Sequence, residues 1–332
     1  MYDYSNQIQT FHDEKVRLST EMSATLLAHR QANEDRLTSR LPDLRDSVRI
    51  SHSRYRSQGS FAMRTIIQTR LSEEEYDIDY GVLLHRVDLA ESSGADMSAG
   101  DATDLVRNAL KDDRFSRQPI KKLNCVRVFY ADKDEHRHHV DFPVYRTYTE
   151  DDGIVHQELA TSEGWSPSDP TAINSWFEKL IATREAEHTG WGAQTRQLVR
   201  LLKRFCRSRR DWDMPNGLKL TMLVAETGEY DQRIDAAFDA MLRRIQERLS
   251  LNLEVQNLAA AHPAQHKLTR TSSDQNMIDL RDRSKEACEA MDILHDRECT
   301  RLAARKAWDA VFKSAGYFES LDDDDSGGND PD

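Results

Sequence analysis

The chain has 332 residues, of which 38% are hydrophobic and 31% are charged, and its formal net charge is −12. This length favours two domains or lobes, and no apolar run approaches the ~18 residues of a membrane span. The acidic balance argues against a protein whose main task is to coat duplex DNA or RNA. A nucleotide, by contrast, needs only a local cationic pocket and metal ions.

The N-terminal segment predicts the compartment. Residues 1–4 include neither a basic segment nor an apolar one, so we expect no secretory signal, no membrane partner and a cytoplasmic protein. The cysteines are scattered without a C-x-x-C pair, which predicts reduced thiols and no structural zinc site; they are Cys125, Cys206, Cys288 and Cys299.

The first half of the chain is predicted to be mixed in structure. Residues 4–41 lack Gly and Pro and space apolar residues among charges, which predicts one long helix. A strand is expected over residues 76–84. Residues 125–131 and 136–145 are expected to form a hairpin around the turn at 132–135.

From Pro170 onward the pattern is almost wholly helical. Helices are predicted over residues 171–187, 192–210, 218–226, 231–250 and 274–313, the last with an internal break. We therefore expect an α+β protein with a mixed catalytic lobe at 1–165, which includes the N-terminal helix, and a helical lobe at 166–318. Residues 319–332 are acidic, small and polar, and are expected to be a disordered tail.

Three carboxylates are candidates for a metal site. The predicted strand carries Asp77 and Asp79, whose side chains project to one face roughly 6.5–7 Å apart because strand side chains alternate. Asp141, between apolar neighbours on a second predicted strand, can complete a triangle. Close carboxylates repel by roughly 1–4 kcal/mol per pair, so cations must offset the repulsion. Two Mg²⁺ ions, with Mn²⁺ as a possible substitute, suit such a site for phosphoryl chemistry.

A possible phosphate-binding turn precedes the strand. Gln58, Gly59 and Ser60 come before a predicted short helix, which can present backbone N–H groups and a hydroxyl to phosphates. A D-x-D pair alone is more often only a polar strand end. The order Gly-Ser, then D-x-D, then a strand Asp is fairly specific. It predicts a polymerase-β-like nucleotidyltransferase lobe with a mixed sheet.

The helix predicted at 192–210 has a basic stripe. Its cations recur every three or four residues, opposite an apolar face; they are Arg196, Arg200, Lys203, Arg207 and Arg210. The stripe is either a solvated face or a phosphate-binding face. We expect Lys203 to reach the triphosphate of a bound nucleotide, and Asn216, in the next turn, to be a further phosphate contact.

Three histidines near Asp141 also invite a metal interpretation. His136 and His138 share one face of the predicted strand, whereas His139 lies on the other. With no further ligand in view for the histidine pair, no metal site is predicted from these residues.

Three motifs together resemble a known family. They are the segment Gln58–Phe61, the segment Asp77–Gly81 and the segment Val140–Pro143, and they resemble the bacterial cyclic GMP-AMP-synthase-like (cGAS/DncV-like) nucleotidyltransferases, often called CD-NTases. The helix at 196–204 and the segments at 220–226, 253–258 and 268–270 also resemble that family. The similarity runs from about residue 5 to about residue 318.

The resemblance implies an enzyme of bacterial antiphage signalling. It would join nucleoside triphosphates such as ATP and GTP into a cyclic oligonucleotide, here favoured as a guanine-containing dinucleotide, that activates a separate effector protein. Asp77, Asp79 and Asp141 would hold Mg²⁺, with Asp141 also a candidate base. Gly59 and Ser60 would contact the triphosphate, and Lys203 would contact phosphate. Asn216 stands where the family leads us to expect serine.

Two alternatives to a cyclic product stay open. The first is a nucleotidyltransferase that makes a linear product or tails RNA. The second is a catalytically silent protein that binds nucleotide as a sensor. The intact trio of carboxylates counts against the second alternative, because a silent relative would be expected to lose at least one of them.

Overall fold

The computed structural model describes residues 1–68, 76–131, 137–151, 153–260, 266–269 and 271–321, and the chain forms two compact units. One unit, the α/β unit, spans Leu18–Ser175, and the other, the helical unit, combines Met1–Arg17 with Trp176–Asp332. The turn predicted at 132–135 and most of the tail predicted at 319–332 lie outside the described residues. Throughout the described ranges, each helix is too short or too polar to cross a bilayer, and all four cysteines are free thiols.

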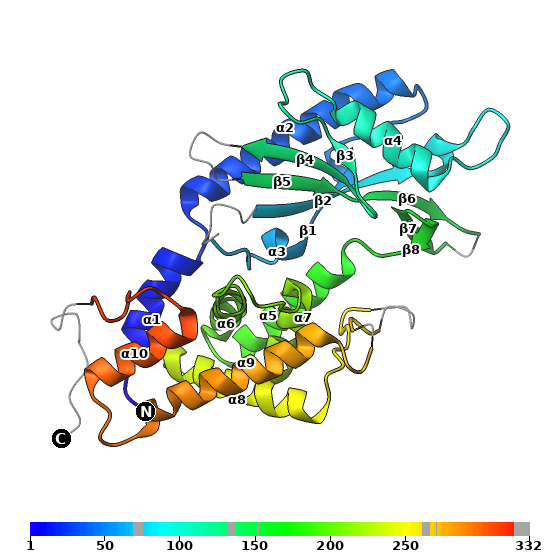
Figure 1. Ribbon diagram of the computed structural model, residues 1–332. Coiled ribbons are helices and arrows are strands. Elements are labelled where there is room, and N and C mark those ends of the chain that lie inside the picture. The colour runs from blue at the N-terminus through cyan, green and yellow to red at the C-terminus, as the bar shows by residue number, and fades with distance from the viewer. Residues whose placement is uncertain (69–75, 132–136, 152, 261–265, 270, 322–332) are drawn as a thin grey trace. The chain divides into compact units, whose positions relative to one another are not determined.

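The α/β unit is built on one mixed sheet (Figure 1). Its strands pair in the order β3-β4-β5-β2-β6-β7-β8, with β1 added on β2. Their bounds are β1 Tyr55–Gln58, β2 Tyr76–His85, β3 Ile120–Lys121, β4 Val126–Ala131, β5 Arg137–Phe142, β6 Val144–Thr149, β7 Val155–Thr161 and β8 Gly164–Pro167. The predicted strand at 76–84 and the predicted hairpin strands are confirmed, since β4 and β5 pair antiparallel.

Strand β2 organises this sheet. It runs parallel to β5 over Tyr76–Asp79 and parallel to β6 over Val82–His85, in the same register for both. Pro143 separates β5 from β6 because it has no N–H for the ladder, yet its carbonyl accepts a hydrogen bond of 2.9 Å from Val82 N. β5 and β6 therefore follow one edge of β2 in succession, and the register of β5 fixes which side chains lie beside the D-x-D pair.

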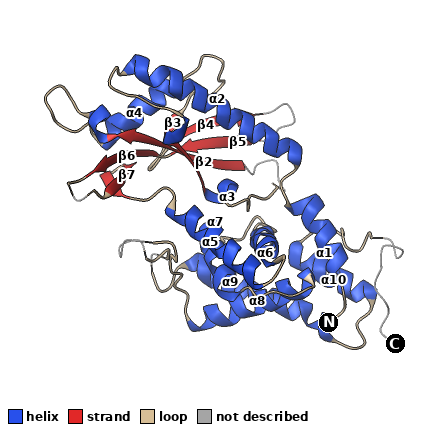
Figure 2. Cartoon of the chain, turned by 180° about the vertical axis from the view of Figure 1, so that it is seen from behind, coloured by secondary structure: helices blue, strands red, loops and turns tan. Residues whose placement is uncertain are grey.

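Helices cover one face of the sheet. Figure 2 shows α2 (Thr20–Leu44) and α4 (Ala99–Leu110) together on that face, whereas the short α3 (Gly59–Ala62) lies apart from them. The buried side chains of β2 on the helical face include Ile78, Val82 and Leu84. Because strand side chains alternate, the odd-numbered Asp77 and Asp79 are directed to the opposite face. The apolar core thus orients the acidic pair.

The helical unit confirms the predicted run of helices. Its helices are α1 Ser5–Phe11, α5 Ala172–Glu187, α6 Trp191–Cys206, α7 Gly217–Thr227, α8 Ile234–Leu251, α9 Gln275–Met291 and α10 Arg301–Phe312, α5 beginning just before the unit boundary. The predicted break near the end of the chain separates α9 from α10. Short 3₁₀ turns occur at His52–Arg54 and Arg86–Leu89 in the α/β unit and at Asp292–His295 here.

The prediction of one long N-terminal helix is wrong. After α1 the chain forms a π-helical turn, His12–Val16, and then Arg17 is extended, with φ −67° and ψ 137°. The Ser19 side chain accepts a hydrogen bond from Met22 N and starts α2 as a separate helix. Phe11 packs against Phe312 and Phe318 with ring centroids 4.9 and 5.0 Å apart, so residues 1–17 belong to the helical unit.

Candidate active site

Four charged or titratable side chains share the sheet face opposite α2 and α4. In the parallel register of β2 and β5, Asp77 lies beside His139 and Asp79 lies beside Asp141. The two pairs form a small square, because residues two apart on a strand point the same way. The structure thus brings together the three predicted carboxylates, and it adds a histidine that the sequence analysis had set aside.

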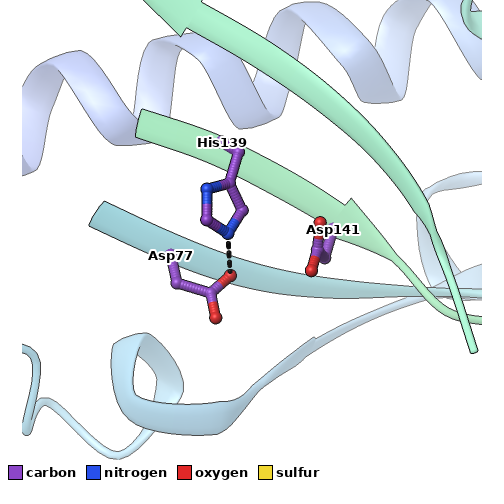
Figure 3. Close-up of side chains that lie close together, drawn as sticks. All are labelled: Asp77, His139 and Asp141. Carbon is purple, nitrogen blue, oxygen red and sulfur yellow. Dashed lines mark ion pairs between the residues drawn. The ribbon is translucent and has the colours of Figure 1, made fainter. Parts of the chain in front are cut away.

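His139 is the member that the sequence reasoning missed. Its Nε2 lies 3.1 Å from Oδ1 of Asp77 (Figure 3). One ligand atom from each of Asp77, His139 and Asp141 lies within 4.8 Å of the others. The signal was present in the sequence: His139 precedes Asp141 by two residues and therefore shares its strand face.

Burial and neighbouring charges shift the pKa values of these groups. Burial, followed by the charges of Asp77 and Asp141, raises the pKa of Asp79 to about 7. Burial lowers the pKa of His139, but its bond to Asp77 and the nearby carboxylate charges outweigh burial, so the net pKa is raised. Positive charge is therefore favoured at this point, and the donor set of carboxylate oxygens and one imidazole nitrogen fits a divalent cation.

Arg127 on β4 is a second residue that sequence reasoning missed. It pairs with Asp141 across the antiparallel β4–β5 ladder. Its Nε and Nη2 donate to Oδ1 and Oδ2 of Asp141 at 2.8 and 2.7 Å. This two-point bond raises the pKa of Arg127 and fixes the plane of the Asp141 carboxylate. No local pattern marks Arg127, because its partner is set by strand pairing.

The Gly-Ser turn lies directly against the acidic pair. Gly59 has φ +64°, and a β-carbon there would overlap the Asp79 carboxylate. Gln58 pairs with Asp79 in the β1–β2 ladder, and its side chain bonds the Tyr145 hydroxyl at 3.2 Å. Ser60 follows in the first turn of α3, where backbone N–H groups have no intrahelical acceptor. The turn and the carboxylates thus form one continuous site in the α/β unit.

Lys203 forms part of a cationic site in the helical unit. It is only 4% exposed, and burial, then Arg207 and Arg200, lowers its pKa to about 7. A β-carbon on Gly217 would lie 3.3 Å from its Nζ, so the ammonium group lies at the start of α7. A helix N-terminus carries partial positive charge, and the combination attracts an anion such as phosphate.

The rest of the predicted basic stripe differs from expectation. Helix α6 ends at Cys206, so Arg207 is its C-cap residue and Arg210 lies beyond it. Arg196 bonds Glu178 at 2.9 and 3.0 Å, and Arg200 donates to His12 Nε2 at 2.9 Å. These two arginines are engaged within the helical unit, because α5 and the π-helical turn pack on the stripe. Lys203, by contrast, lies beside Gly217 at the start of α7.

Asn216 acts as the N-cap of α7. Its Oδ1 accepts a hydrogen bond of 3.1 Å from Lys219 N, which satisfies one donor of the first turn. The cap fixes the start of α7 against Lys203. What Asn216 itself can offer a phosphate is its amide N–H₂ group, since its carbonyl oxygen serves the helix.

Comparison with known proteins finds a family match over part of the chain. A family profile described as cyclic GMP-AMP synthase DncV-like, nucleotidyltransferase domain, matches residues 53–145, the segment that carries the turn and all three carboxylates. Residues 53–145 are thus similar to the nucleotidyltransferase domain of DncV-like cyclic GMP-AMP synthases. A cyclic GMP-AMP synthase from Escherichia albertii is 28% identical over 261 residues, which are 77% of this chain and 54% of that synthase. The chain thus spans about half the length of that relative.

Solved structures of DncV proteins share the fold of this chain. Vibrio cholerae DncV cyclic AMP-GMP synthase, in complex with the linear intermediate pppA(3′,5′)pG, superposes with a TM-score of 0.73 and 14% identity over 94% of this chain and 96% of that one. Escherichia coli DncV with 3′-deoxy GTP superposes with a TM-score of 0.71 and 17% identity over 95% of this chain and 97% of that one. The expected polymerase-β-like lobe with a helical second lobe is confirmed.

Proposed function

We propose that this DncV-like chain is a metal-dependent nucleotidyltransferase that joins nucleoside triphosphates into a cyclic dinucleotide containing guanine. The observation that carries the proposal is the square of Asp77, His139, Asp79 and Asp141 beside the Gly59 turn, within a domain of this family. The DncV structures bound to GTP, to 3′-deoxy GTP or to the linear intermediate pppA(3′,5′)pG support ATP and GTP as substrates. Mg²⁺ is the proposed metal, with Mn²⁺ as a substitute.

The proposed chemistry is an in-line attack of a ribose hydroxyl on the α-phosphate of a second nucleotide, with pyrophosphate as the leaving group. A bound divalent cation would supply charge neutralisation and polarise the attacking and leaving oxygens. Asp77, Asp79 and Asp141 would hold it, and Arg127 orients Asp141 by its two-point bond. A second transfer on the linear product closes the ring.

The phosphate contacts are proposed for each unit separately. In the α/β unit, the Ser60 hydroxyl and the first N–H groups of α3 would bind a triphosphate, next to the Asp79 carboxylate. Gln58 would hold this turn through its bond to Tyr145. In the helical unit, Lys203 with the start of α7, capped by Asn216, would bind phosphate.

The deciding experiment is incubation of the purified chain with all four labelled nucleoside triphosphates and Mg²⁺, then phosphatase treatment and mass analysis. A phosphatase-resistant dinucleotide containing guanine is expected. The Asp77→Asn/Asp79→Asn double variant should lose at least about 10³-fold in turnover while staying folded. The matched control is Asp43→Asn. Asp43 is an exposed residue of α2, which lies on the sheet face opposite the carboxylates.

Other outcomes distinguish the alternatives. A product that phosphatase degrades would favour a linear or RNA-tailing transferase. Nucleotide binding with no product from any mixture would favour a silent sensor. Wild-type turnover in the double variant would remove the carboxylates from the mechanism.

We further propose that the product activates a separate effector protein in bacterial antiphage defence. Support comes from the family alone. In cells that carry the gene with its native neighbours, the efficiency of phage plating should rise when Asp77→Asn replaces the wild type. Equal plating in both strains would separate the enzyme from defence.

A further inference from the structure

The metal square contains two kinds of donor. Asp79 and Asp141, adjacent in the β2–β5 register, offer only oxygen, whereas the other adjacent pair offers the Asp77 carboxylate and the His139 imidazole. Oxygen donors suit Mg²⁺, but an imidazole nitrogen favours first-row transition ions. The two ends of the square therefore differ in the ion that they should prefer.

The geometry at the imidazole end allows one ion to be shared. One atom from each of Asp77, His139 and Asp141 lies within 4.8 Å of the others. Two ligands on one ion are separated by at most twice the metal–ligand distance, or about 4.4 Å. The Asp77 side chain is 49% exposed, so its carboxylate can move closer by the few tenths of an ångström required. His139 is 6% exposed and is held in place by its strand.

We propose that His139 is a metal ligand: its Nε2, with one oxygen each of Asp77 and Asp141, binds a divalent transition ion, for which Mn²⁺ is the probe. This inference rests on the proposed metal site of the active centre and extends it, since the trio predicted there consists only of carboxylates. In the metal-free protein His139 pairs with Asp77, and the ion takes the place of that contact. The chain should thus bind Mn²⁺ more tightly than Mg²⁺ at this end.

Direct observation of the ion tests the proposal without nucleotide. Metal-free protein is titrated with Mn²⁺ alone by electron paramagnetic resonance, and the bound ion is examined by pulsed methods for coupling to ¹⁴N. A nitrogen coupling is expected in the wild type and should disappear in His139→Gln. The affinity for Mn²⁺ should fall at least about tenfold, with a smaller change for Mg²⁺ in competition.

The matched control is His156→Gln. His156 on β7 also faces a carboxylate, with Nε2 3.6 Å from Oε2 of Glu150, but belongs to another strand pair. Its replacement should leave the nitrogen coupling and the Mn²⁺ affinity unchanged. Bound Mn²⁺ without nitrogen coupling in the wild type, or coupling that persists in His139→Gln, would overturn the proposal.

Two further measurements keep the result interpretable. If His139→Gln does not fold, wild-type protein labelled with ¹⁵N-histidine replaces it, and the coupling pattern must change to that of ¹⁵N. Because no nucleotide is present, a nitrogen-ligated ion in a chain that forms no dinucleotide would refute the proposed function alone. A normal dinucleotide product with no nitrogen coupling would refute the role of His139 alone.

Discussion

Gly59 lies in van der Waals contact with the carboxylate of Asp79, and only a glycine fits between them. A β-carbon at this position would overlap Oδ2 and lie 3.2 Å from Cγ of Asp79, and the backbone has φ +64°. Because residue 59 has no side chain, the turn that is proposed to bind phosphate can lie directly against the carboxylate that is proposed to bind metal.

Replacing Gly59 by alanine should affect activity more than stability. The left-handed backbone costs alanine about 1 kcal/mol, and Asp79 must move to relieve the overlap. We expect Gly59→Ala to lower dinucleotide formation at least about 100-fold, by analogy with a roughly 1 Å misplacement of a catalytic group. Gly94→Ala is the control, since Gly94 has φ +83° and nothing within 4 Å of an added β-carbon. Equal activity in the two variants would contradict the proposed role of the contact.

Removing Arg127 should make the fold depend more strongly on metal. Arg127→Met leaves the buried Asp141 without its two hydrogen bonds, which should lower the free energy of unfolding of the metal-free protein by on the order of 1–3 kcal/mol. Mg²⁺ should then raise the melting temperature more in the variant than in the wild type, because the ion takes over the charge. Thermal melts with and without Mg²⁺ measure both effects.

The control for Arg127 is an ion pair on the surface. Arg107 bonds Asp104 at 3.0 Å on α4, with both side chains more than 30% exposed. Such pairs contribute roughly 0–1 kcal/mol, so Arg107→Met should change the melt little and leave its response to Mg²⁺ unaltered. Identical metal responses in the wild type and in Arg127→Met would show that the ion does not replace the charge of Arg127 beside Asp141.

Lys203 should make stability depend on pH. Its pKa is about 7 in the folded protein, against an ordinary 10.5. Between these two pH values the unfolded chain binds more protons than the folded chain. The free-energy cost of burying the charge is therefore present in full below pH 7 and decreases as the pH rises toward 10.5. Lys203→Met should therefore be more stable than the wild type at pH 6.5, and the difference should shrink at pH 9.5. Urea unfolding at each pH measures the difference.

The same variant tests anion binding in the helical unit. Pyrophosphate should raise the melting temperature of the wild type more than that of Lys203→Met, in which only the proposed contact at Ser60 remains. Lys179→Met, at an exposed position on α5, should behave as the wild type in both experiments. A stability difference that does not vary with pH would contradict the assignment of a buried, perturbed lysine.

Phe11 should contribute strongly to the stability of the helical unit. It is 1% exposed, and its ring packs on Phe312, Tyr317 and Phe318 at 4.9–5.2 Å between centroids. Phe11→Ala should cost about 3–5 kcal/mol by opening a cavity. Leu27→Ala, at a position of α2 that is 39% exposed, should cost far less. A small effect of Phe11→Ala in thermal melts would place residues 1–17 outside this core.

The helices, and the fact that Asp77 and Asp79 share one face of their strand, could be predicted from the sequence because both depend on local periodicity. The spacing of two residues between Asp77 and Asp79 determines that they share a face, and the helical period determines most of the second half. The break at Arg17–Ser19 was not predictable in this way. A helical pattern continues through it, and what interrupts the helix is the packing of Phe11 into a core formed mainly by the end of the chain.

Tertiary structure alone decided which residues face each other across strands and which charges are buried. Side-chain alternation is a property of each strand, so the sequence by itself determined that Asp77 and Asp79 point together, and that His139 points with Asp141. The register between β2 and β5, some sixty residues apart, depends on packing of the apolar face and brought His139 to Asp77, while the register of the β4–β5 hairpin brought Arg127 to Asp141. Burial of Lys203 at the start of α7 was likewise decided by packing, because a basic stripe has the same sequence whether it is exposed or covered.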